Sequence, residues 1–237
     1  MLLVFLFCLW YNGVLSLDKI CFTILWSETK TMKRRNGKSK VLTRDEIKRV
    51  IQYQKQSRHS VRNICLVNMS IFLGCRVGEI SSLRLNQVVN TDWTIKDEVV
   101  LLKENTKSKK NRVMYLVHKD LRTSLENYIN HRRETEKLEP TKKCFEKPLF
   151  VSQKNGGFSP RSLQRLFKNM YRAVGLDEMI SSHSGRRTFI TNLISSGIDM
   201  KTVSTLSGHS SIQTTVDTYA VANPNKMVNV CRNISIN

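Results

Sequence analysis

The sequence lacks the residue patterns that mark several common classes of protein. Its 6 cysteines are scattered and include no C-x-x-C pair, although the ligands of a structural zinc site normally stand a few residues apart. Neither a phosphate-binding P-loop nor a cluster of carboxylates is present, which argues against chemistry driven by ATP or a metal ion. Cys65 and Cys75 fall within apolar runs, so we expect them to be core residues of a protein from a reducing compartment.

Acidic residues are scarce. The chain of 237 residues has 19 Asp and Glu against 39 Lys and Arg, which gives a formal net charge of +20. The charges in residues 1–31 cancel, so the whole excess lies in residues 32–237. With 40% hydrophobic residues the chain has the composition of a folded protein. The charge predicts an acidic partner, most often nucleic acid, and leaves a membrane surface as the alternative.

A long hydrophobic run is also missing. The N-terminal stretch MLLVFLFCLW is apolar, but it has no basic region before it and is too short to span a membrane comfortably. Residues 1–31 therefore read as an apolar leader, either a signal or anchor or a segment that is not translated. Met32, directly before Lys33-Arg34-Arg35, is an alternative start.

The rest of the chain predicts one mainly α domain with a small β insertion. Thr43 and Glu46 have the spacing of a capping box, and Ser159-Pro160 is a typical helix start. Two β-rich runs flank a basic turn at residues 103–112. Residues 134–147 read as a charged connector. Helices are expected after Thr43 and over 61–73, 77–83, 119–133, 160–174, 183–196 and 199–206.

Four segments carry polar residues that structure alone does not require. Taken singly, each residue has an ordinary explanation, such as a salt bridge from Arg76 to Glu79 or a solvated charge at Lys107. Together and in this order the segments resemble the boxes of the tyrosine recombinase (phage integrase) family. The segments are LGCRVGEISSLRLNQV (73–88), NTKSKKNRVMYL (105–116), HSGRRTFIT (183–191) and LSGHSSIQTTVDTYA (206–220).

The resemblance implies a catalytic role for each matching residue. Tyr219 would attack a DNA phosphodiester, leaving a 3′-phosphotyrosine link and a free 5′-hydroxyl. Arg76 and Arg186 would hold the non-bridging oxygens of the scissile phosphate, where two guanidinium groups match the charge that grows in the transition state. Lys107 would give a proton to the leaving 5′-oxygen.

The remaining matching residues would assist. His183 would help proton transfer at the tyrosine, His209 would hydrogen-bond the phosphate, and Glu79 would hold the first arginine box in shape without touching DNA. The covalent link conserves the energy of the phosphodiester bond, so no cofactor, ATP or metal is expected. DNA contacts are expected from Lys33, Arg34, Arg35, Lys109, Lys110, Arg112 and Arg187.

The resemblance also implies an architecture and partners. We expect a mainly α fold with a small antiparallel β-sheet: a basic arm at 32–42, the recombinase catalytic domain at 43–225 and a tail at 226–237. The short arm is similar to that of minimal fimbrial-type invertases, and a mobile-element integrase is equally compatible. The partners would be double-stranded DNA at specific sites, a homo-tetramer and accessory DNA-bending proteins, with no membrane.

Some departures from the family pattern and some alternatives stay open. Gly185 stands where the family usually has leucine, and no separate clamp domain is recognisable before Thr43. A recombinase-derived DNA-binding protein that regulates or shapes DNA without recombining it is therefore an alternative. A secreted or anchored basic protein would rest on residues 1–26 alone. The expected location is on DNA in the cytoplasm, or in the nucleus for a eukaryotic host or virus.

Overall fold

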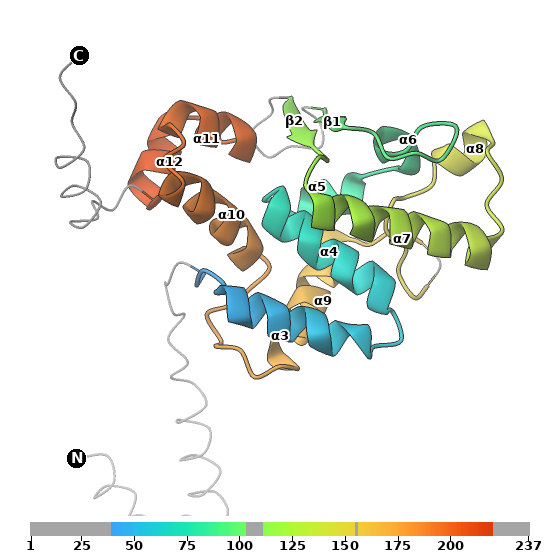
Figure 1. Ribbon diagram of the computed structural model, residues 1–237, viewed down its shortest axis with the longest axis horizontal. Coiled ribbons are helices and arrows are strands. Elements are labelled where there is room, and N and C mark those ends of the chain that lie inside the picture. The colour runs from blue at the N-terminus through green and yellow to red at the C-terminus, as the bar shows by residue number, and fades with distance from the viewer. Residues whose placement is uncertain (1–38, 103–110, 155, 220–237) are drawn as a thin grey trace, which may run out of the picture. The chain divides into compact units, whose positions relative to one another are not determined.

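The computed structural model describes residues 39–102, 111–154 and 156–219, with side chains as far as Val216. This part of the chain is mainly helical with one small antiparallel sheet, which confirms the predicted fold class (Figure 1). The elements are α3 (Arg44–Lys55), α4 (Ser60–Phe72), α5 (Val77–Ser82), α6 (Leu85–Val88), β1 (Glu98–Leu101), β2 (Arg112–Tyr115), α7 (Lys119–Glu136), α8 (Lys142–Phe145), α9 (Pro160–Arg172), α10 (Ser184–Ser195), α11 (Met200–Ser207) and α12 (Ile212–Tyr219).

The first described helix begins where its capping residues predict. The Thr43 hydroxyl accepts from the Glu46 backbone N–H at 3.2 Å, and the Glu46 carboxylate accepts from the Thr43 N–H at 2.8 Å. This reciprocal pair satisfies two backbone donors that have no partner inside the helix. Ser159 caps α9 with its hydroxyl alone, which accepts from the Ser162 N–H at 3.2 Å, and Pro160 fills the first helical position. Both predicted starts are confirmed.

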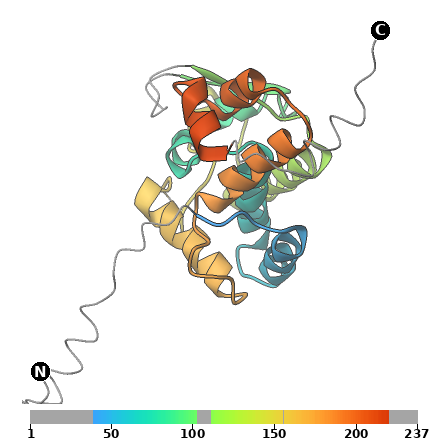
Figure 2. The same ribbon diagram turned by 90° about the vertical axis from the view of Figure 1, so that its left-hand side faces the viewer.

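Helix α4 lies at the centre of the core. It packs against α7, α10 and α3, and α3 and α9 lie on either side of it (Figures 1 and 2). Cys65 is completely buried in this helix, and Cys75 is 1% exposed just after it. Burial raises the pKa of both thiols, that of Cys75 to about 12, so both are neutral. The prediction that they are core residues is confirmed.

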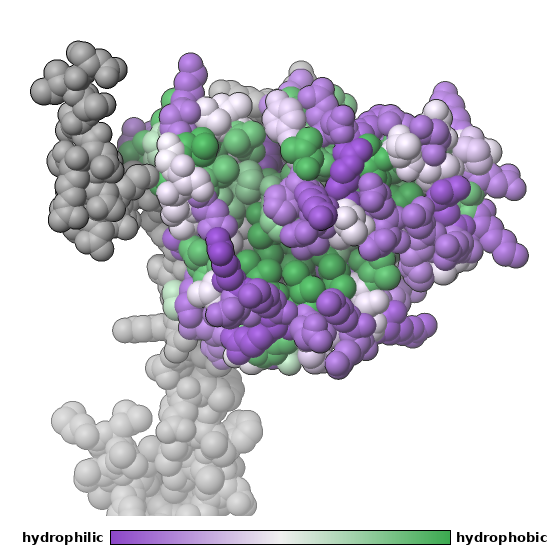
Figure 3. Space-filling model, viewed as in Figure 1, coloured by the Kyte–Doolittle hydropathy of each residue, from purple (hydrophilic) through white to green (hydrophobic). Residues whose placement is uncertain are grey.

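An apolar groove crosses the surface over α4. Figure 3 shows hydrophobic side chains gathered at the centre of this face, between α3 and α7. A hollow of about 650 Å³ lies there, lined among others by Ile51, Val61 and Ile64. Among the described residues, no helix combines the length and hydrophobicity needed to cross a membrane.

The small sheet joins the predicted β-rich runs. Strand β1 pairs antiparallel with β2, and the register sets Glu98 opposite Tyr115 and Leu101 opposite Arg112. Because side chains alternate along a strand, Val99 and Met114 point into the core while Val100 and Tyr115 face outward. The segment between the strands, residues 103–110, lies outside the described residues, and so do Lys107, Lys109 and Lys110.

Three stretches differ from the sequence expectation. The connector predicted at 134–147 instead contains the last turn of α7 and the short helix α8, whose Phe145 is 8% exposed and contacts the Trp93 ring. Helix α6 was not expected, and neither was α12, whose sequence is largely polar. These elements depend on contacts distant in sequence, which local patterns do not record.

The start of the described domain is attached to α10 and the loop before it. The Lys40 N–H donates to the Met179 carbonyl at 3.1 Å, and the Leu42 N–H donates to the Thr188 hydroxyl at 2.9 Å. Leu42 is 4% exposed and belongs to the core. The end of the predicted arm therefore packs on the domain. The predicted leader (1–31), the rest of the arm up to Lys38, and the tail (226–237) lie outside the described residues.

Candidate active site

The turn after α4 positions the first arginine. Gly74 has a φ of 59°, and a Cβ at this position would lie 3.0 Å from Cγ of the Phe189 ring, so glycine suits both the backbone and the space. After this turn Arg76 is the N-cap residue of α5, with its side chain 21% exposed. The turn thus leaves the guanidinium of Arg76 at the edge of the core, partly open to solvent.

Glu79 joins two arginines inside the protein. It is 1% exposed, and its Oε1 accepts from Arg76 Nη1 at 2.7 Å. Its Oε2 accepts from the Arg76 backbone N–H at 2.9 Å and from Arg112 Nη1 at 2.6 Å. Burial acts to raise the pKa of Glu79, but Arg112 and the contacts with Arg76 outweigh it, so the pKa is lowered. Glu79 is therefore ionised and holds both guanidinium groups.

Arg112 was expected to contact DNA, and the structure corrects this expectation. The residue is 3% exposed. Besides Glu79, its guanidinium donates to the Leu206 carbonyl at 2.9 Å and to the Leu73 carbonyl. The reason lies in the strand, because Arg112 shares the inward face of β2 with Met114. Arg112 links the β2 strand to the turn after α4 and to α11.

Arg186 reaches the same place from α10. It is 6% exposed, and it donates from Nη1 to the Gly74 carbonyl at 2.8 Å and from Nη2 to the Ser207 carbonyl at 2.6 Å. Arg76 Nη2 donates to the next carbonyl, that of Gly208, at 3.3 Å. Two arginines from distant boxes therefore converge on the turn that ends α11, at Ser207 and the C-cap residue Gly208.

The approach of α10 to α4 depends on a small residue. A Cβ at Gly185 would lie 2.9 Å from Ser70 Cβ and 3.2 Å from its backbone carbonyl carbon, which is closer than real side chains pack. Glycine therefore stands where the family pattern has leucine because the two helices cross closely at this point. That crossing sets Arg186, the next residue, beside Gly74.

His209 stands beside the arginines. Gly208 before it is left-handed, with a φ of 61°, and the His209 ring Nδ1 lies 2.6 Å from the hydroxyl of Thr215, a buried residue of α12. Burial lowers the pKa of His209 to about 4, helped by Arg186 and Arg76, so the ring is neutral at physiological pH. Tyr219 ends α12 one turn beyond Thr215.

The other two expected residues on α10 lie nearer the surface. His183 is exposed at the N-cap of α10, whereas Arg186 on the following turn is buried, so they differ in environment despite their spacing. Arg187 is half-buried and donates to the Ser39 carbonyl, which ties α10 to the end of the arm.

The structure brings four of the expected residues together: Arg76, Glu79, Arg186 and His209. Arg112, which was expected to contact DNA, joins this group instead, and the alternation with Met114 could have indicated its inward position. The structure adds Thr215, for which the sequence gives no signal beyond its place in the last box. In the described ranges, no group of three or more His, Cys, Asp and Glu residues could hold a metal ion.

A family model matches most of the chain. The model of the phage integrase family covers residues 40–226, which includes every element described above. The chain belongs to the phage integrase family of tyrosine recombinases. Membership fits the geometry, because residues of all four family boxes meet around the end of α11, at Leu206, Ser207 and Gly208.

Curated members of the family resemble the chain over part of their length. The tyrosine recombinase XerC of Thermodesulfovibrio yellowstonii is 26% identical over 186 residues, which is 78% of this chain and 59% of that protein. The XerC of Chlamydia pneumoniae is 29% identical over 160 residues, 66% of this chain and 46% of that protein. The chain spans about half the length of these relatives.

Solved structures of the family share the fold. The XerA recombinase superposes with a TM-score of 0.64 at 20% identity, over 83% of this chain and 66% of that one. The Tn1549 transposon integrase in complex with transposon right end DNA gives 0.67 at 15% identity, over 88% and 70%. The catalytic domain of bacteriophage HP1 integrase gives 0.54 at 20% identity, and 95% of it is covered by 82% of this chain.

Proposed function

We propose that this chain is the catalytic part of a site-specific DNA recombinase, which cuts and rejoins DNA strands through a covalent phosphotyrosine at Tyr219. One observation carries the proposal: Arg76 and Arg186 come from different boxes and both donate hydrogen bonds to the turn before His209. Each guanidinium has five N–H donors, enough to share between the turn and a phosphate.

The proposed chemistry follows from these groups. A phosphodiester gains negative charge as the tyrosine oxygen attacks, and Arg76 and Arg186 would stabilise that charge within a preformed, partly buried site. His209 is neutral at physiological pH. It would therefore hydrogen-bond a phosphate oxygen without adding a charge. In this scheme Arg112 and Glu79 position Arg76, and neither touches DNA.

The two remaining catalytic roles are also proposals. Lys107 would give a proton to the 5′-oxygen as that oxygen leaves the phosphate that becomes linked to Tyr219, because an ammonium group can act as a general acid. His183, exposed at the start of α10, would assist proton transfer at the phenol, whose ordinary pKa of about 10 makes it a weak nucleophile at neutral pH.

The partner of this chemistry would be double-stranded DNA. The net charge of +20 supports it, as do the family structures solved with DNA. The residues proposed to contact DNA are now Lys33, Arg34, Arg35, Lys109, Lys110 and Arg187. Assembly as a homo-tetramer on paired sites, with accessory DNA-bending proteins, belongs to the same proposal.

A nicked duplex tests the proposal. Cleavage next to the nick releases a short strand, so the covalent intermediate accumulates and migrates as a slower band on a denaturing gel. The substrates would be duplexes taken from the DNA that flanks the gene. The wild-type protein and Tyr115→Phe, which alters an exposed tyrosine of β2, should form the band. Tyr219→Phe should bind the duplex and form no band.

Two results would contradict the proposal. A band that persists in Tyr219→Phe would assign the attack to another group. DNA binding by the wild type without a band on any flanking duplex would instead favour the DNA-binding protein that does not recombine.

A further inference from the structure

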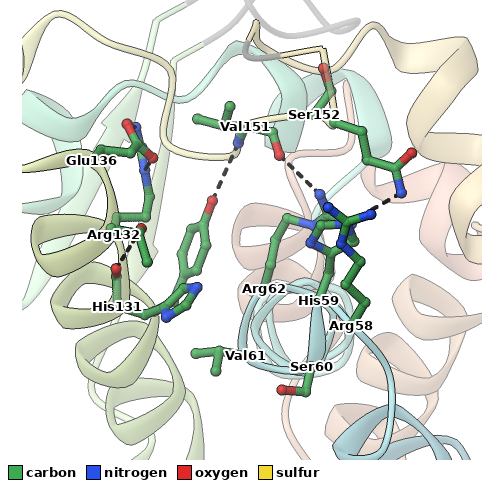
Figure 4. A pocket seen from close by; sticks show the side chains of 13 residues that line it. Arg58, His59, Ser60, Val61, Arg62, His131, Arg132, Glu136, Val151 and Ser152 are labelled. Atoms are coloured by element: carbon green, nitrogen blue, oxygen red, sulfur yellow. Dashed lines mark hydrogen bonds and ion pairs between the residues drawn. The ribbon is translucent and has the colours of Figure 1, made fainter.

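A second basic site lies at the other end of α4. A pocket of about 580 Å³ opens between the start of α4, the last turns of α7 and residues 151–153 (Figure 4). Arg62 in the first turn of α4 lines it, whereas Gly74 of the candidate active site follows the last turn. The ten helical steps from Arg62 to Phe72 alone span about 15 Å, so the pocket is distinct from the site around Arg186.

Arg62 is a buried cation with neutral partners. It is 7% exposed, and its Nε and Nη2 donate to the Asn63 side-chain oxygen at 3.2 and 3.1 Å. Its Nη1 donates to the Val151 carbonyl at 3.1 Å, and the guanidinium carbon lies 5.1 Å from the centre of the Phe158 ring. Within the described part of the chain, no carboxylate forms an ion pair with Arg62. A desolvated charge of this kind is stabilised by an anion.

Further basic groups surround the same opening. Figure 4 shows Arg58, His59 and Arg62 on one wall and His131 on the facing wall, from α7. The pKa of His59 is lowered first by burial and then by the nearby positive charges of Arg62, Arg58 and His131. Gln153 adds an amide, whose Nε2 lies 3.2 Å from His59 Nε2.

The lining supplies no free negative charge to offset these groups. Its one acidic residue is Glu136, which accepts from Arg132 at 2.6 and 2.7 Å with both oxygens. The start of α4 has no side-chain cap and no acidic residue in its first turn, so the positive end of the helix dipole adds to the field.

We propose that this pocket binds a phosphate group, held by Arg58 and Arg62 on one wall and by His131 on the other. The guanidinium forks fit phosphate oxygens, and imidazole N–H groups donate to them. The phosphate can belong to a small soluble compound or to a DNA backbone, and both sources present the same chemistry to the pocket. The proposal does not depend on recombination, because none of these residues belongs to the candidate active site.

The five histidines of the chain allow a local test. His59 and His131 line the pocket, and His183 and His209 report on the candidate active site, so nitrogen-15 NMR of the imidazoles separates the two places. Pyrophosphate is the first probe and a short DNA duplex of unrelated sequence is the second. Arg58→Gln removes an exposed pocket cation, and Arg49→Gln removes an exposed cation from α3 as the matched control.

Pyrophosphate should shift the His59 and His131 signals saturably. Arg58→Gln should weaken this binding about tenfold, the value of one charge-assisted hydrogen bond, while Arg49→Gln leaves it within about twofold. If the duplex shifts the same signals and displaces pyrophosphate, the natural phosphate belongs to DNA; if only pyrophosphate shifts them, it belongs to a soluble compound. Shifts confined to His183 and His209, or equal losses in both variants, would overturn the proposal.

Discussion

Two of the buried arginines, Arg112 and Arg62, differ in how the protein balances their charge. Arg112 is 3% exposed and shares the carboxylate of Glu79 with Arg76, so its charge is balanced inside the fold. Arg62 is 7% exposed and rests on an amide oxygen, a carbonyl and an aromatic ring. Burial lowers the pKa of Arg62.

The comparison distinguishes a buried charge that holds its neighbours in place from a buried charge that can bind a ligand. A buried ion pair that is fully hydrogen-bonded fixes the geometry around it, and breaking it leaves a charge with no partner. A buried cation with neutral acceptors lacks such a partner from the start. The Arg112 site is therefore closed and positions its neighbours, and the Arg62 site is suited to a ligand.

The largest effect is expected from Glu79→Gln. The substitution leaves Arg76 and Arg112 without their shared negative charge, which should cost about 3–5 kcal/mol of unfolding free energy. Urea denaturation followed by circular dichroism measures it. Asp97→Asn, which breaks an exposed pair with Arg122, is the control and should cost about 0–1 kcal/mol. Equal losses in both variants would show that the closed site has no special stability.

Arg112→Met should have the next largest effect. Glu79 keeps Arg76 as a partner, but it loses one charged hydrogen bond, and the carbonyls of Leu73 and Leu206 lose a donor. We expect a loss of about 2–3 kcal/mol in the same urea titration. Cleavage of the nicked duplex should fall as well, because Arg76 is less firmly held. A loss of stability with undiminished cleavage would argue against positioning by Arg112.

The contribution of Glu79 should disappear in acid. Its folded-state pKa is lowered below the ordinary value of 4.5, so its stabilising effect is complete above that value and is lost as the pH falls through the lowered pKa. The difference in unfolding free energy between the wild type and Glu79→Gln should therefore be constant near neutral pH and shrink under acid conditions. A difference that stays the same down to strongly acidic pH would contradict this account.

The smallest effect is expected from Arg62→Met without phosphate. The Asn63 side-chain oxygen and the Val151 carbonyl lose donors, but the cost of burying a charge without an ion-pair partner is removed as well, so the unfolding free energy should change by about 1 kcal/mol or less. Adding pyrophosphate should stabilise the wild type and leave Arg62→Met unchanged, since a ligand stabilises only the state that binds it. A large loss in phosphate-free buffer would make Arg62 a structural residue like Arg112.

Local signals in the sequence predicted much of the fold. The hydrogen bonds that start α3 and α9 join residues three apart, so the Thr43–Glu46 pair and the Ser159–Pro160 start could be read from the chain alone. Helix α12 could not, because its residues are mostly polar and the buried Thr215 contacts His209 across a turn. Its stability comes from the tertiary fold, which no local pattern contains.

The sequence predicted which residues belong to the candidate site but not which contacts they make there. The order of the boxes along the chain is enough to point to Arg76, Arg186 and His209. The position of Arg112 was misjudged because its basic neighbours suggested a solvated turn, whereas the alternation of β2 sets it inward with Met114. The backbone carbonyls that accept from the arginines depend on how α10 and α11 pack, and this packing cannot be read from the sequence.

The close crossing of α4 and α10 at Ser70 and Gly185 has a consequence for how this lineage can change. A leucine at 185, as in the usual family pattern, would overlap Ser70. Such a substitution is therefore tolerated only when residue 70 is replaced by a smaller one or when the two helices move apart. The two positions are thus expected to vary together among descendants of this sequence, with a small residue kept on at least one helix. Such paired variation in related sequences would reflect how closely the two helices pack.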